Sequence, residues 1–174
     1  MASIIKINDM VLDELIKHCN INPNLECGGY LYGRYKSTYT DDIITITGIY
    51  YERIFGTENR FTFSPLYKMR AINKGKEIYR INGSKFIGCY HSHGKYRAQF
   101  SDVDRCMEIE HYRSNKAALI YSPIEDKLIG DIITSSKISE ARITVISCDE
   151  FDRLYFPTLP KTSGKVISLK KKSK

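Results

Sequence analysis

The chain has 174 residues, of which 42% are apolar and 27% are charged, and its formal net charge is +7. This length can bury the core of one domain, and the composition excludes a chain that is disordered throughout. Six lysines and no acid lie in residues 158–174, so the rest of the chain carries only +1 and the charge does not indicate a DNA-binding domain.

In chain order, the first predicted elements are a short strand at residues 3–9 and a helix over 9–20 that is capped by Asn8 or its neighbour. Two stretches with the alternation typical of strands follow at 28–36 and 41–53. Because only a few residues separate them, we expect these two strands to pair as part of a meander.

The middle of the chain predicts a second helix. Residues 61–63 resemble a short strand, and Ser64 followed by Pro65 is a favoured helix start. The helix is therefore expected over about 65–80. A buried strand over 85–93 comes next.

The last part of the chain predicts a third helix over 101–114 and three further strands, at 116–123, 127–136 and 141–148. Strands and helices thus occur in mixed order. The expected architecture is an α/β fold in which a mixed, curved β-sheet is flanked by helices.

Domain organisation and compartment follow from what the sequence lacks. No internal repeat or proline-rich linker divides the chain, so we expect one domain over 1–157 and a basic, flexible tail over 158–174. The five cysteines form no C-x-x-C pair, which favours a reducing compartment over a disulfide framework. The N-terminus lacks the apolar core of a signal peptide, and no window is apolar enough to span a membrane. We expect a cytoplasmic protein; nothing in the sequence indicates its oligomeric state.

Residues 90–104, "YHSHGKYRAQFSDVD", contain a candidate metal site. Alternate side chains of a strand share a face, so His91 and His93 point the same way, and a helix that starts after a seven-residue loop offers Asp104 in its first turn. Two imidazoles and a carboxylate suit Zn²⁺ and leave a fourth position open, as in catalytic zinc sites. Each part alone has another interpretation: buried histidines need bind no metal, and Ser101 with Asp104 can form a helix cap.

Glu26 is the candidate general base. Such a zinc site needs a group that takes a proton from a water molecule. Glu26 stands before a glycine pair and a strand, among apolar neighbours, which is an unusual setting for a solvated acid. The alternative is a glutamate in a surface loop.

The joint pattern resembles the JAMM metalloproteases, the catalytically competent members of the MPN-domain (Mov34/PAD-1-type, prokaryotic JAB-like) family. The resemblance rests on "ECGGYLYG", on "HSH" and on S-x-x-D after a seven-residue spacer, and it covers roughly residues 8–135. Many members have proline where this chain has Gly94 and Phe100. These positions are not ligands, so the departures concern the rigidity of the loop.

The resemblance implies a role for each motif residue. His91, His93 and Asp104 bind one zinc ion per chain, and Glu26 activates the water molecule that attacks an amide carbonyl. Ser101 donates a hydrogen bond to the oxyanion of the tetrahedral intermediate. No covalent enzyme intermediate is required, so Cys27 and Cys89 are expected to be small, buried strand residues.

The resemblance also implies a substrate class. The family commonly cleaves the bond between the C-terminal glycine of a ubiquitin-like protein and a lysine, so deconjugation or precursor processing is expected, with a bacterial ubiquitin-like or antiphage pathway as one setting. A sulfur-carrier-processing peptidase and a non-catalytic MPN-like scaffold are the alternatives; binding to a membrane or to a specific nucleic acid is not expected. Residues 52–63 are the candidate substrate channel, although the three phenylalanines in this segment are equally explained as core residues: Phe55, Phe61 and Phe63.

Overall fold

The computed structural model of the chain describes residues 2–105, 116–134 and 137–150. Within them lies one eight-stranded sheet with the strand order β7-β6-β5-β4-β2-β3-β1-β8. The strands are β1 (Ala2–Asn8), β2 (Cys27–Ser37), β3 (Asp41–Phe55), β4 (Lys85–Ser92), β5 (Ala117–Ser122), β6 (Lys127–Ile133), β7 (Ile138–Glu140) and β8 (Arg142–Ile146). Two helices accompany the sheet: α1 (Asp9–Cys19) and α2 (Pro65–Asn82). The expected fold class is confirmed.

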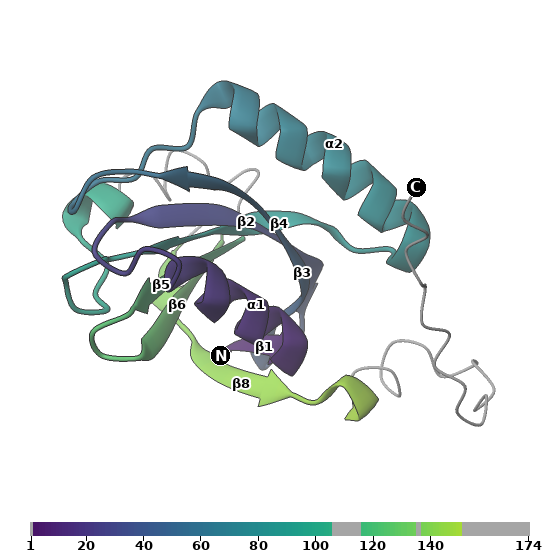
Figure 1. Cartoon of the computed structure of the whole chain (residues 1–174). Coiled ribbons are helices and arrows are strands. Elements are labelled where there is room, and N and C mark those ends of the chain that lie inside the picture. Colours follow the sequence, from purple (N-terminus) through teal and green to yellow (C-terminus); the bar gives the residue numbers. More distant parts are fainter. Residues whose placement is uncertain (1, 106–115, 135–136, 151–174) are drawn as a thin grey trace, which may run out of the picture.

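The sheet is mixed and strongly curved. β1 runs parallel to β3 and β8, and β4 runs parallel to β5, whereas β2 is antiparallel to both β3 and β4. In Figure 1 the sheet curves around α1, with β2 above the helix and β8 below it. The curvature brings β6 against β1. The two strands are so close that a Cβ atom added to Gly130 of β6 would lie 2.9 Å from the side chain of Ile5 of β1.

The two helices cover opposite faces of the sheet (Figure 1). On β2, Leu31 packs in the same cluster as Leu15 of α1, whereas the neighbouring Tyr30 packs with Tyr67 of α2. This is the alternation expected of a strand, with one side chain for each face. Because both faces are covered, residues 27–33 of β2 are all buried, which positions the start of this strand firmly.

The starts of both helices agree with the sequence. The Asn8 side chain accepts a hydrogen bond from the Met10 N–H at 3.0 Å and caps α1. The Ser64 hydroxyl accepts from the Tyr67 N–H at 3.1 Å just before α2. Each side-chain oxygen satisfies one of the N–H groups that a helix leaves unpaired at its first turn.

The predicted short strand at 61–63 is wrong. These residues have no strand geometry, and the rings of Phe61 and Phe63 pack against each other and against the core under α2, with Phe63 4.9 Å from Tyr30 between ring centroids. Phe55 packs against the core around α1. The aromatic residues of the candidate channel are therefore half-buried residues packed against the core, and at 61–63 this packing replaces strand pairing.

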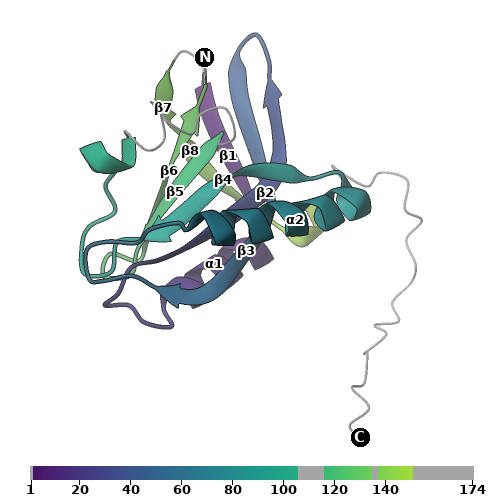
Figure 2. The same cartoon turned by 90° about the horizontal axis from the view of Figure 1, so that it is seen from above.

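Other differences lie near the end of the chain. The helix predicted over 101–114 begins at Asp102 and continues to residue 105, and residues 106–115 are not among those described. The three-residue β7, at the edge of the sheet (Figure 2), was not predicted because it is too short to show a period. The domain boundary at 157 and the tail over 158–174 lie outside the described residues.

The described cysteines and helices bear on the expected compartment. Four cysteines are described, and all are free thiols: Cys19, Cys27, Cys89 and Cys148. In the described part of the chain, no helix combines the length and the apolar character needed to span a bilayer. A cytoplasmic location stays a prediction.

Candidate metal centre

The end of β4 brings two histidines to one side of the sheet. His91 lies on β4, and His93 continues the strand path by donating its backbone N–H to the carbonyl of Tyr121 on β5 at 3.0 Å. Ser92, between them, points to the opposite face and is fully buried. The two imidazoles consequently face each other, with their Nε2 atoms 3.2 Å apart, as strand alternation predicts.

Asp104 completes the group from the first turn of the helical segment that follows the loop. Its Oδ1 lies 3.3 Å from Nε2 of His91, and its Oδ2 lies 3.7 Å from Nε2 of His93. Ligand atoms of a tetrahedral zinc site lie about 3.3 Å apart when the metal–ligand bonds are about 2.0–2.1 Å long. The three side chains can therefore hold one metal ion with small movements.

The surrounding backbone sets the tautomer of His93. Its Nδ1 lies 3.0 Å from the carbonyl oxygen of Arg97. Because a carbonyl oxygen only accepts hydrogen bonds, Nδ1 carries a hydrogen, so that in the neutral ring Nε2 keeps a lone pair directed at the centre. This support was not predicted, since a backbone carbonyl leaves no mark on the sequence. The donor set and its orientation fit zinc.

The charges of the centre are coupled. Burial raises the pKa of Asp104, but hydrogen bonds from His91 and His93 outweigh this effect and hold that pKa well below its usual range. Burial likewise lowers the pKa of His93, but the hydrogen bond to Asp104 outweighs burial and raises it above the usual value. Binding of a metal ion therefore competes with protonation of His93.

We expect the affinity for zinc to fall as the pH decreases. A proton must leave His93 before this side chain binds a metal ion, and its pKa is raised above 6.5. The apparent dissociation constant should be nearly constant above that pKa and should rise about tenfold per pH unit below it. Competition with a chromophoric chelator between about pH 5.5 and about pH 8.5 measures this dependence. A flat profile would exclude His93 as a ligand.

Glu26 is buried beside the same centre. Its backbone is held by the loop after β3, since its N–H donates to the Thr57 carbonyl at 2.9 Å and its own carbonyl accepts from Gly56 at 2.7 Å. The residue is only 7% exposed, so it is not a solvated surface glutamate. Burial raises the pKa of Glu26, and the positive charge of His91 partly opposes this effect. A buried carboxyl group with a raised pKa beside candidate ligands has the properties of a general base.

Ser101 forms a helix cap. Its hydroxyl accepts from the Asp104 N–H at 3.2 Å and donates to Asp104 Oδ2 at 2.6 Å, and its own N–H donates to the same oxygen at 2.8 Å. These are the contacts of the capping arrangement that S-x-x-D permits. They also orient the Asp104 carboxylate toward the histidines. A role in oxyanion stabilisation stays a prediction.

The loop between the histidines and the cap is held without proline. Gly94 has a φ of +45°, which proline, with its φ near −65°, cannot adopt. The Tyr96 carbonyl accepts from the Ser122 hydroxyl at 2.7 Å, and Phe100 is buried in an apolar cluster with Ala118. Contacts with β5 therefore restrain this loop. The sequence alone did not show whether the loop would be rigid without the two prolines.

Comparisons with known proteins agree with this architecture. A family model described as prokaryotic homologs of the JAB domain matches residues 9–142. The solution structure of protein DSY2949 from Desulfitobacterium hafniense is similar, with a TM-score of 0.59 and 22% identity over 83% of this chain and 94% of that chain. At this identity the likeness supports the fold alone. The chain has no significant match among curated proteins.

Proposed function

Because the chain belongs to the family of prokaryotic homologs of the JAB domain, we propose that it is a zinc-dependent peptidase. The family includes metalloproteases and also non-catalytic members. The observation that supports catalysis is the convergence of His91, His93 and Asp104 beside the buried carboxyl group of Glu26. A scaffold protein needs neither a complete set of ligands nor a buried acid next to it.

The proposed mechanism divides the work among these residues. A zinc ion held by the two histidines and Asp104 supplies Lewis-acid activation of a water molecule and of the amide carbonyl. Glu26 accepts a proton from the water molecule while the oxygen of that water molecule forms a bond to the carbonyl carbon. When the C–N bond breaks, Glu26 returns this proton to the leaving amine nitrogen. Ser101 turns its hydroxyl hydrogen from Asp104 to the oxyanion that forms in between and donates a hydrogen bond to it.

For the substrate, we propose the amide bond after the C-terminal glycine of a ubiquitin-like protein, in deconjugation or in precursor processing. The family resemblance supports this class. The position of the centre is compatible with a protein tail, because the candidate ligand side chains are 13–18% exposed, which makes the site accessible from the surface. A sulfur-carrier protein offers the same C-terminal glycine and is the alternative substrate.

A cleavage panel tests this proposal. Ubiquitin-like and sulfur-carrier proteins would be supplied as linear reporter fusions and as lysine-linked conjugates, together with untreated, chelator-treated and zinc-restored protein. We expect cleavage after the glycine only when zinc is bound, and the preferred substrate identifies the pathway class. If fully zinc-loaded protein cleaves no member of the panel, the scaffold function replaces the peptidase.

Substitution of Ser101 separates the cap from the proposed oxyanion donor. If the hydroxyl only caps the helix, Ser101→Ala should lower the free energy of unfolding by about 1 kcal/mol and leave kcat unchanged. We expect kcat to fall by roughly 10²- to 10³-fold, because an oxyanion donor is lost. Ser101→Thr, which keeps the hydroxyl, is the control, and zinc content is measured in both variants because Ser101 also orients Asp104. A lower melting temperature with wild-type kcat contradicts the catalytic role.

A further inference from the structure

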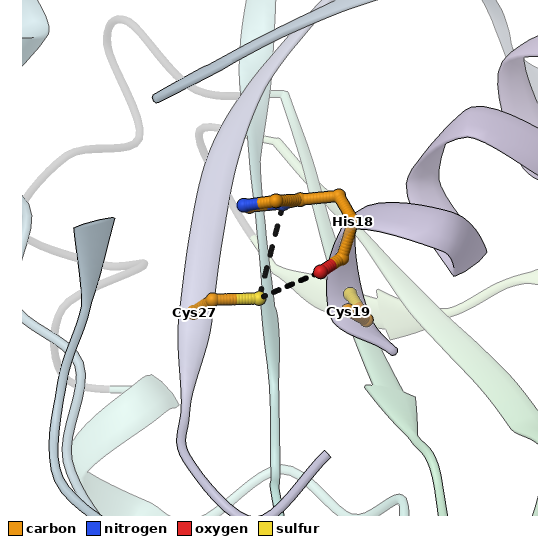
Figure 3. Close-up of side chains that lie close together, drawn as sticks. All are labelled: His18, Cys19 and Cys27. Atoms are coloured by element: carbon orange, nitrogen blue, oxygen red, sulfur yellow. Dashed lines mark hydrogen bonds between the residues drawn. The ribbon is translucent and has the colours of Figure 1, made fainter. Parts of the chain in front are cut away.

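A second group of metal-ligand side chains lies behind the candidate metal centre, where the end of α1 meets the start of β2. Figure 3 shows Cys27 on β2 pointing toward the ring and the carbonyl of His18, with Cys19 next to His18. All three residues are completely buried. One ligand atom from each lies within 4.8 Å of the other two.

The distances within this group are close to those of a tetrahedral site. The sulfur of Cys27 is 3.8 Å from Nδ1 of His18, and the hydroxyl oxygen of Tyr90 is 2.9 Å from the same nitrogen. Zinc–sulfur bonds of about 2.3 Å and zinc–nitrogen bonds of about 2.0–2.1 Å place sulfur and nitrogen ligands about 3.5 Å apart. An ion therefore fits after shifts of a few tenths of an ångström in the side chains.

The orientation of the His18 ring leaves a lone pair available. Nδ1 is the nitrogen that faces the sulfur of Cys27, and its neighbour Tyr90 has a hydroxyl group that can donate to it. Nothing there forces a hydrogen onto Nδ1, in contrast to His93, where a carbonyl oxygen requires one. The other nitrogen, Nε2, has no hydrogen-bond partner in the part of the chain that the structure describes, so it can carry the hydrogen.

The two sulfur atoms lie within 4.8 Å of each other. The sulfur of Cys27 also accepts a hydrogen bond from the Ser92 hydroxyl at 3.5 Å. The backbone N–H of Cys27 donates to the same hydroxyl at 3.0 Å. Two sulfur ligands and an imidazole nitrogen form a softer donor set than the histidine and carboxylate group of the candidate centre.

We propose that His18, Cys19 and Cys27 bind a second, structural zinc ion at this buried position, with the Tyr90 hydroxyl beside it. Sulfur ligands closed off from solvent are typical of structural zinc, whereas an open position is typical of catalytic zinc. Because every ligand is buried, the ion enters while the chain folds. It joins the end of α1 to β2 immediately after Glu26, and the contact between Cys27 and Ser92 extends this link to the strand that carries the histidines.

Cobalt substitution tests the proposal, because only thiolate ligands produce a sulfur-to-cobalt charge-transfer band. The full chain is unfolded, refolded with Co²⁺ under reducing conditions and freed of excess metal. We expect a second cobalt ion per chain beyond that of the candidate centre, together with this band. Cys19→Ser and Cys27→Ser should lose the band and the second ion. Cys89→Ser, on β4 and outside the group, is the matched control and should keep both.

A further variant separates this site from the proposed catalytic one. His91→Ala should lose the first cobalt ion and keep the charge-transfer band. If refolded wild-type protein binds cobalt without the band, the proposal is overturned, and this result holds even when a cysteine variant fails to fold. A mass that is lower by two hydrogens, with Cys19 joined to Cys27 in protein purified without oxidant, would also overturn it.

Discussion

Glu26→Gln is expected to lower kcat by about 10⁴-fold or more, while the protein keeps its zinc and its fold; loss of a general base typically costs about 10²- to 10⁴-fold. Gln has the same shape and can still form hydrogen bonds, but it cannot accept a proton from water or deliver one to the leaving amine. The loss should reach or exceed the upper end of this range, because one group performs both transfers. Cleavage of the preferred glycine-linked substrate, at saturating concentration, measures it.

The substitution Glu26→Gln is also expected to change the stability of the protein in a definite direction. Burial raises the pKa of Glu26 in the folded protein, so folding disfavours the ionised form at every pH above the pKa of the unfolded chain. At neutral pH the uncharged amide removes this cost, and the melting temperature of the metal-free variant should equal or exceed that of wild type. Glu58→Gln is the control, since Glu58 pairs with Lys95 at the surface and should change neither rate nor zinc content. A Glu26→Gln protein with wild-type kcat would show that the base is another group, and one without zinc would make Glu26 a ligand.

Asp104→Ala and His91→Ala should each remove the zinc ion of the candidate metal centre. Each variant leaves two of three protein ligands, and the loss of affinity should exceed the 10- to 100-fold typical for a residue that only supports a ligand. Metal analysis after dialysis should show one zinc equivalent fewer than wild type, with no cleavage of any substrate. The proposed thiolate site is counted separately by its charge-transfer band, so the two losses are distinguished.

Asp102→Ala is the matched control for Asp104→Ala. Both acids lie in the same helical turn, but Asp102 is exposed, whereas Asp104 contacts both histidines. Asp102→Ala should therefore keep the zinc ion and kcat. Full zinc occupancy of the candidate centre in both Asp104→Ala and His91→Ala would refute this assignment of ligands.

Much of the candidate site was predictable because its geometry is local. His91 and His93 share a face since a strand has a period of two, and Asp104 lies in the first turn of a helix that Ser101 caps. The helix starts at Asn8 and Ser64 were equally readable, because a capping side chain bonds to a backbone group two or three residues away. The segment 61–63 was not, because distant aromatic partners decide its conformation.

The sequence by itself determined which side chains are available for zinc chemistry and how neighbouring ones are oriented, because caps and strand alternation depend on a few adjacent residues. The tertiary structure alone decided that Glu26 is buried beside the histidines, since this depends on the pairing of β2 with β4, in which Gly28 lies opposite His91. It also decided the tautomer of His93, through the carbonyl of Arg97. The group of His18, Cys19 and Cys27 has the same origin: a sheet that curves around α1 brings the end of this helix against the start of β2, and spacing along the chain does not encode that contact.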